Sequence, residues 1–134
     1  MPKVIRLIVC IYSFLICNNF LFAQKGALVD GHPAWIMQGN IYEVNVRQYT
    51  PEETFKAFEK SLPRLKQMGV QTLWFMPINP ISKVDRKGAL GSYYAVANYN
   101  AINPEFGTMD DWRNLVNHCH DMGFKVIMDW VPNH

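Results

Sequence analysis

The pattern of apolar and polar residues predicts three strands between residues 41 and 130. Residues 41–49, IYEVNVRQY, alternate between two faces and are rich in β-branched and aromatic residues. Residues 72–78, TLWFMPI, are almost wholly apolar, which is typical of a strand buried on both faces of a parallel sheet. Residues 125–130, KVIMDW, contain a similar apolar run. We therefore expect three strands, the last two buried on both faces and their Trp74 and Met76 in the core.

The segment between the first two strands has the pattern of a helix. Thr50 and Glu53 predict a capping box, with Pro51 at the first helical position. Pro63 should bend the helix, and Gly69 should end it. Its apolar stripe, at three- and four-residue spacing, comprises Phe55, Phe58, Leu62, Leu65 and Met68.

A second helix is predicted before the third strand, with a capping box at Thr108 and Asp111 and an end at Gly123. Its apolar stripe comprises Trp112, Leu115, Val116, Cys119 and Met122. The order strand, helix, strand, helix, strand indicates an α/β fold with a parallel sheet. Residues 79–107, between the second strand and this helix, form a loop long enough to suggest a functional role.

The first residues differ from the rest and are typical of a targeting segment. Lys3 and Arg6 precede an apolar run, and Ala23 offers a small residue for cleavage. This layout predicts a secretory signal peptide over residues 1–23, and hence a secreted or periplasmic protein. An uncleaved signal anchor is the alternative. We expect residues 24–40 to be an irregular lead-in and residues 41–134 to form the domain.

Charge and cysteine content narrow the classes of function. The formal net charge is +2, and removal of Lys3 and Arg6 leaves 11 basic residues against 11 acidic ones. A neutral chain has no basic field for nucleic acid or anionic lipid, so neither is an expected partner after signal cleavage. Cys119 is the only cysteine after residue 23, so no disulfide can form within that part of the chain.

Residues that follow the predicted strands are the candidates for a site, because sites in parallel α/β folds lie at the carboxyl ends of strands. The segment NVRQY lies at the end of the first strand, and the long loop follows the second. Asp129 ends the third strand, and Asn133 and His134 follow it. In the long loop, aromatic rings beside amides suit a sugar. Among these we favour Tyr94 for the site and expect Tyr99 to pack the loop.

Two other clusters have simpler explanations than chemistry. His118, Cys119 and His120 are adjacent on a helix and cannot share one face, which argues against a metal site. Asp110 and Asp111 open a helix and complement its dipole.

Taken together, four segments resemble the start of the α-amylase family, glycoside hydrolase family 13. They occur in the family's order and spacing and extend over residues 36–134. The segments are IYEVNVRQYTPE, LPRLKQMGVQTLWFMPI, YYAVANYNAINPEFGT and FKVIMDWVPNH. The resemblance implies a (β/α)8 TIM barrel, of which this chain would hold about the first three strands and two helices.

The resemblance also implies roles for four residues. Asp129 resembles the aspartate that supports the catalytic centre, and Tyr94 resembles the tyrosine stacked beneath the sugar. His134 resembles the histidine that hydrogen-bonds the same sugar. Asn133 resembles the asparagine that binds calcium in many members, which makes calcium a candidate cofactor.

The sequence departs from the family's pattern at three places. The family often has Gly-Tyr where this chain has Tyr93-Tyr94, an acidic residue at Asn98, and glycine at Glu53. The Asn98 difference concerns local hydrogen bonding in the loop.

The resemblance implies an α-amylase-like hydrolase of α-glucans or oligosaccharides with a retaining mechanism. Such enzymes need two carboxyl groups, a nucleophile and an acid/base. In the family these follow the fourth and fifth strands, beyond His134, so we expect no catalytic carboxylate here and a truncated, inactive chain. The alternative is a non-enzymatic amylase-like protein that binds glucan or a partner.

Overall fold

The computed structural model describes residues 28–132. The chain divides into two compact units, and the boundary lies between Gln38 and Gly39 in the sequence. In the first unit, β1 (Leu28–Val29) pairs antiparallel with β2 (His32–Pro33), and the short 3₁₀ helix η1 (Ala34–Ile36) follows. The turn between the strands has positive φ at Asp30 (51°) and Gly31 (80°), as Asp-Gly hairpin turns require. This hairpin lies in the segment expected to be irregular. None of the described helices is long and apolar enough to cross a membrane.

The second unit is built on a three-stranded parallel sheet. Its strands are β3 (Ile41–Val44), β4 (Thr72–Phe75) and β5 (Lys125–Met128), with β4 in the centre. The register aligns Tyr42 with Leu73 and Leu73 with Val126. The expected parallel α/β order is therefore confirmed, although each strand is shorter than its apolar run.

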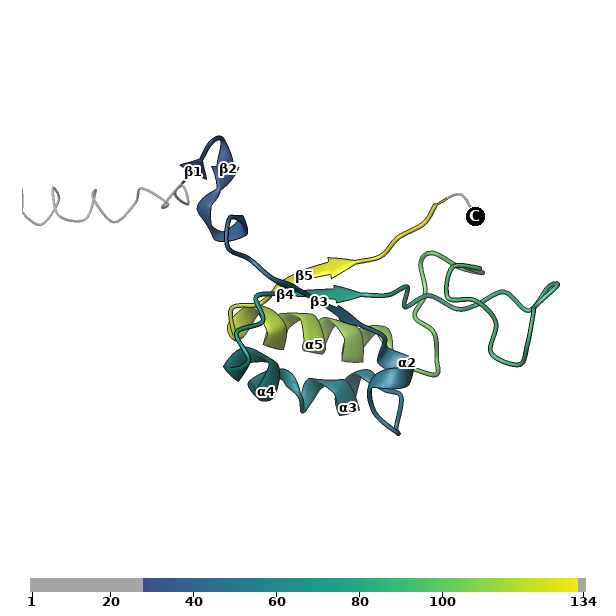
Figure 1. Ribbon diagram of the computed structural model, residues 1–134. Coiled ribbons are helices and arrows are strands. Elements are labelled where there is room, and N and C mark those ends of the chain that lie inside the picture. The colour runs from purple at the N-terminus through teal and green to yellow at the C-terminus, as the bar shows by residue number, and fades with distance from the viewer. Residues whose placement is uncertain (1–27, 133–134) are drawn as a thin grey trace, which may run out of the picture. The chain divides into compact units, whose positions relative to one another are not determined.

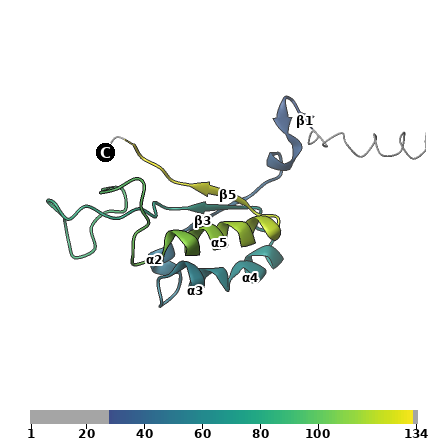
Figure 2. The same ribbon diagram turned by 180° about the vertical axis from the view of Figure 1, so that it is seen from behind.

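The helices of this unit lie against one face of the sheet (Figures 1 and 2). They are α2 (Val46–Tyr49), α3 (Phe55–Glu59), α4 (Leu62–Gln67) and α5 (Met109–Asp121). The long loop after β4 extends beyond the carboxyl ends of the strands in both views. The sheet therefore has one helix-covered face and one face without a helix in the described chain.

The predicted first strand is too long, because the chain turns into α2 after Val44. Asn45 precedes this helical turn with an extended backbone. The turn buries Val46 and Arg47, which are 3% and 6% exposed. The alternation of polar and apolar residues thus continues past the end of the strand because Val46 is buried in α2, not because it pairs with β4.

The predicted start of the first helix is also wrong. Thr50 and Glu53 form a turn, in which the Glu53 N–H donates to the Thr50 carbonyl at 3.1 Å. The N-cap is Thr54, whose hydroxyl accepts from the Ala57 N–H. Glu53 has φ of 59°, which no helix can contain and which favours glycine.

The predicted bend in this helix is a complete break between α3 and α4. Pro63 lies in the first turn of α4, where its missing N–H costs no hydrogen bond. Gly69 follows the helix with φ of 84°, as expected for a C-cap glycine. Met68 is 58% exposed and lies outside the core, because it follows the last turn of α4.

The second helix is confirmed with its cap. Thr108 and Asp111 form a reciprocal capping box at the start of α5, and Gly123 lies just past its end with φ of 80°. Leu115 and Cys119 are fully buried on its inner face.

The core lies between the sheet and the helices, and its centre is aromatic. The Phe58 and Phe75 rings meet edge-to-face at 5.4 Å, and Phe75 meets Trp112 at 5.0 Å. On the other face of the sheet, Trp74 is 37% exposed and Ile127 is 44% exposed. The expectation that β4 and β5 are buried on both faces, with Trp74 in the core, is therefore wrong for the described chain. Met76 is half-buried.

Candidate functional site

The candidate site lies at the carboxyl end of β5. The Asp129 N–H donates to the Phe75 carbonyl at 2.8 Å, which extends the ladder one residue past the strand. This bond fixes the Asp129 backbone, and its side chain accepts a hydrogen bond from the Tyr94 hydroxyl at 2.9 Å from Oδ2. The structure thus brings together two of the predicted site residues, which are 35 positions apart.

The Tyr94 hydroxyl is held in its protonated form. Its pKa is raised above the ordinary value, chiefly by the hydrogen bond to Asp129 and then by burial. The negative charges of Asp129 and Glu43 add to the effect. Tyr94 is therefore a hydrogen-bond donor at neutral pH, and it orients the carboxylate of Asp129.

Tyr93 is anchored on the opposite edge of the sheet. Its hydroxyl donates to Asn45 Oδ1 at 3.0 Å, and the Arg47 guanidinium lies 4.6 Å from its ring centroid. Asn45 and Arg47 belong to the segment NVRQY, which the sequence predicted at this edge of the sheet without a role for either residue.

The rest of the long loop is tied down by buried amides and a ring contact. Asn79 is 5% exposed, and its Nδ2 donates to the Tyr99 and Ala101 carbonyls at 3.2 and 3.1 Å. The Tyr99 hydroxyl donates to the Val131 carbonyl at 2.7 Å, and its ring meets Trp130 edge-to-face. This agrees with the packing role expected for Tyr99.

Asn98, one of the departures from the family's pattern, keeps a local hydrogen bond. Its Oδ1 accepts from the Asn100 N–H at 2.9 Å. The amide thus supplies an acceptor to the loop without a negative charge.

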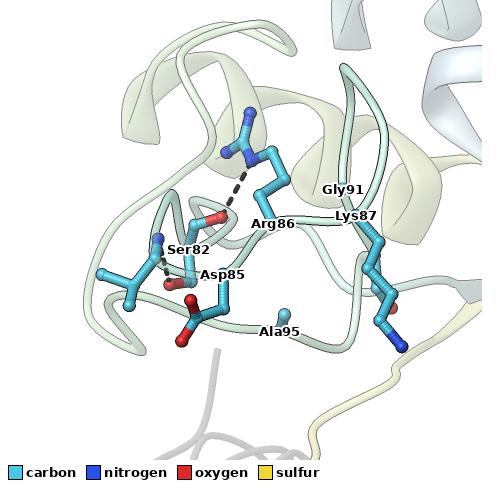
Figure 3. Close-up of a pocket in the computed structure, with 8 residues that line it drawn as sticks. Ser82, Asp85, Arg86, Lys87, Gly91 and Ala95 are labelled. Atoms are coloured by element: carbon cyan, nitrogen blue, oxygen red, sulfur yellow. Dashed lines mark hydrogen bonds between the residues drawn. The ribbon is translucent and has the colours of Figure 1, made fainter.

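A cavity of about 190 Å³ lies within this loop and is lined in part by Arg86 and Lys87 (Figure 3). Arg86 is committed to the backbone: Nε donates to the Ser82 carbonyl and Nη2 to the Ile81 carbonyl, both at 2.9 Å. Gly91 has φ of 70°, and a Cβ there would lie 2.8 Å from Ile81 Cγ2. The cavity is a consequence of loop packing around Arg86, whose donors are used within the loop.

The other two predicted site residues, Asn133 and His134, lie outside the described residues, as does the predicted signal peptide. Within residues 28–132 no group of three or more His, Cys, Asp or Glu side chains could hold a metal ion. Asn133, the predicted calcium ligand, lies outside these residues, so calcium binding stays a prediction.

The histidine–cysteine cluster of α5 has structural contacts. His118 Nδ1 lies 2.7 Å from Glu59 Oε1, which links α5 to α3. Cys119 is fully buried, and burial raises the pKa of its thiol to about 12. The cysteine is therefore an inert core residue at neutral pH.

Comparison with known proteins decides the family. The family model for the α-amylase catalytic domain matches residues 54–134, more than half of the chain. The chain belongs to the α-amylase family. The fold of that catalytic domain is a TIM barrel, and the parallel sheet with helices on one face is consistent with a part of it.

Three relatives illustrate the range of the α-amylase family around this chain. A solved α-amylase from Lactobacillus plantarum has a TM-score of 0.70 at 46% identity, over 72% of this chain and 23% of that one. An α-glucosidase of Apis mellifera is 34% identical over 70% of this chain and 16% of its own length. The amino acid transporter heavy chain SLC3A1 of Mus musculus is 32% identical over 75% of this chain and 14% of its own length. The chain thus spans less than a quarter of each relative.

The arrangement can bind and orient, but the carboxylate it fixes is already paired. Asp129 accepts from Tyr94, which suits a residue that supports a site more than one that attacks a substrate. The Tyr94 ring is half-buried beside this carboxylate.

Proposed function

We propose that this chain is the N-terminal part, about three strands and two helices, of the (β/α)8 catalytic barrel of a retaining hydrolase acting on α-glucans or oligosaccharides. The observation that carries the proposal is the hydrogen bond from Tyr94 to Asp129 at the carboxyl end of β5. Sites of this fold lie at that edge. The similarity to an α-amylase and an α-glucosidase supports the reaction class.

The proposed division of roles follows from the chemistry of the residues. Tyr94 stacks beneath the sugar and donates to Asp129, which keeps that carboxylate in one orientation. His134 donates to the sugar, and Asn133 supplies an oxygen ligand if calcium binds. The nucleophile and the acid/base come from outside these 134 residues, so we propose that the chain alone is inactive.

A secreted or periplasmic location is part of the proposal. It rests on the basic start, apolar run and small residue of positions 1–23. Mass spectrometry of the N-terminus of the exported protein tests it. A mature N-terminus at Gln24 supports cleavage, and retention of Met1 contradicts it.

The central experiment compares the 134-residue chain with the same chain joined to the downstream barrel segment of the Lactobacillus plantarum α-amylase. Both are assayed for release of reducing sugar from maltodextrin. We expect activity from the joined protein only, and a large loss of that activity with Asp129→Asn. The proposal is wrong if the joined protein folds, is retained by maltodextrin in an affinity gel and releases no sugar.

A second candidate function is a non-enzymatic amylase-like protein that binds a partner. One observation favours it: a relative of comparable similarity is an amino acid transporter heavy chain, not an enzyme by its name. Glucan retention and sugar release by the joined protein separate the two, because the 134-residue chain alone should release no sugar under either function. Absence of both from a joined protein with an intact fold by circular dichroism supports the partner-binding function.

A further inference from the structure

Arg47 is a buried cation next to the proposed site, with no role in the proposed function. Its side chain lies at the start of α2, beyond the carboxyl end of β3, and is almost completely inaccessible. Arg47 Nη2 lies 2.8 Å from Glu105 Oε2, and the two residues form an ion pair in which Glu105 is partly exposed. A buried charge of this kind is kept only where its contacts are specific, because desolvation is costly.

The guanidinium contacts two separate parts of the long loop. Its central carbon lies 4.6 Å from the Tyr93 ring centroid and 5.9 Å from that of Phe106. Glu105 and Phe106 lie near the end of the loop. The Phe106 carbonyl accepts a hydrogen bond from the Phe55 N–H at the start of α3. One side chain from the β3 end thus joins the middle of the loop to its base.

The middle of the loop carries the site tyrosine. Tyr93 is held from the β3 side by Arg47 and by Asn45. Tyr94, the next residue, is held from the β5 side by Asp129. The dipeptide therefore extends between the two outer strands, and displacement of Tyr93 must move the Tyr94 backbone.

We propose that Arg47 is a positioning residue that acts through Tyr93 to set the distance between Tyr94 and Asp129. The role of this pair in sugar binding rests on the proposed function, but the positioning itself does not. A guanidinium suits the task because its charge lies over the Tyr93 ring while Nη2 donates to Glu105. Both contacts restrict its rotation.

The test reads the Tyr94–Asp129 hydrogen bond directly, through the titration of Tyr94. Tyrosinate absorbance is followed with pH in the 134-residue chain, and Tyr94→Phe identifies the Tyr94 transition by subtraction. The charged neighbours that also act on Tyr94 are Asp129 and Glu43, and neither is altered. In Arg47→Met we expect the raised pKa of Tyr94 to return towards its ordinary value.

A matched control separates positioning from general loss of charge. Arg113→Met removes an arginine whose ion pair with Asp110 is solvent-exposed, with side chains 67% and 83% accessible. This variant should leave the Tyr94 titration unchanged. If Arg47→Met alters the far-UV circular dichroism but leaves the Tyr94 pKa raised, the role is structural and the proposal is overturned.

A second variant decides the question if Arg47→Met does not fold. Tyr93→Leu removes the intermediate ring and should shift the Tyr94 pKa in the same direction. In the double variant the shift should not exceed that of either single variant, because the two residues act in one chain of contacts. A Tyr94 pKa that stays raised in a folded Tyr93→Leu variant overturns the proposal.

The joined barrel protein adds a kinetic measurement. There Arg47→Met should lower kcat/KM by about 10- to 100-fold, as small misplacements of site groups do. Failure of the proposed function removes only this arm, because absence of sugar release leaves the titration results intact. An active wild type with an unchanged Tyr94 titration in Arg47→Met contradicts the positioning role alone.

Discussion

At the scale of single residues, the site depends on pairs that are distant in sequence. Asp129 is oriented by a tyrosine 35 positions earlier, and Tyr93 by an asparagine 48 positions earlier. The sequence identified Asp129 and Tyr94 through residue type and family resemblance. It placed the segment NVRQY at the same edge but gave Asn45 and Arg47 no role, because their partners lie tens of positions away in the chain.

Tyr94→Phe should remove the alkaline sensitivity that this hydroxyl confers. The pKa of Tyr94 is raised in the folded chain, so its stabilisation is complete below about pH 10 and is lost as pH rises through the folded-state pKa. Below that range the variant should be less stable by roughly 1 kcal/mol, the net contribution of one hydrogen bond. Urea unfolding at neutral and alkaline pH measures both. A stability difference that grows with rising pH contradicts the assignment.

Glu53→Gly should stabilise the chain by up to about 1 kcal/mol. Glu53 has φ of 59°, and this left-handed conformation is unfavourable for any residue with a Cβ. Urea unfolding of this variant is compared with Glu52→Gly, a change in the same exposed turn. The control should bring no gain, since Glu52 is not among the described residues with positive φ. Equal stabilisation by both would show that backbone strain at Glu53 is not the cause.

At the scale of elements, local signals were reliable only where the chain had no competing alternative. The box at Thr108 formed because α5 continues for three turns behind it. The similar pattern at Thr50 did not form, because Thr54 caps the helix four residues later. Two candidate caps so close together cannot be ranked from sequence.

The α5 capping box should make the start of this helix sensitive to acid. The Asp111 pKa is lowered to about 2, first by the Thr108 backbone N–H and then by Lys56 and the Thr108 hydroxyl. Its stabilisation is therefore complete above about pH 4 and is lost as pH falls to about 2. Nuclear magnetic resonance titration of the carboxyl group measures this directly.

Thr108→Ala removes the hydroxyl of the box and should destabilise the helix by about 1 kcal/mol. The Asp111 pKa should rise only in part, because the backbone N–H of residue 108 and Lys56 still act on the carboxylate. Amide exchange at the start of α5 should accelerate. Asp110→Asn serves as the control, because Asp110 is highly exposed and outside the cap. Amide exchange at the start of α5 that is as slow in Thr108→Ala as in the wild type would show that the Thr108 hydroxyl does not cap the helix.

At the scale of the whole molecule, the sheet of the second unit has one covered face and one that no described helix covers. On that face Trp74 is 37% and Ile127 44% exposed, in neighbouring strands and in register. Contiguous exposed apolar side chains of this kind favour association. They are consistent with a chain that provides one part of a closed barrel.

The 134-residue chain should therefore bind a hydrophobic dye and self-associate. Replacing Trp74 and Ile127 with lysine should lower dye fluorescence and shift gel filtration towards the 15.5 kDa monomer. Val84→Lys is the matched control, since Val84 is 78% exposed in the loop, away from the sheet. A monomeric wild-type chain without dye binding would mean that this face is covered within the chain.

The sequence alone determined the order of elements, the second helix with its cap, and two partners of the site. Those features depend on periodicity, local backbone chemistry and motif resemblance, and each of these can be recognised within a short segment of sequence. The tertiary structure decided where the strands end, which face of the sheet is covered, and that Arg47 and Asn45 hold Tyr93. These depend on contacts between residues tens of positions apart, such as Arg47 with Tyr93 and Glu105, whose geometry exists only after the sheet has assembled.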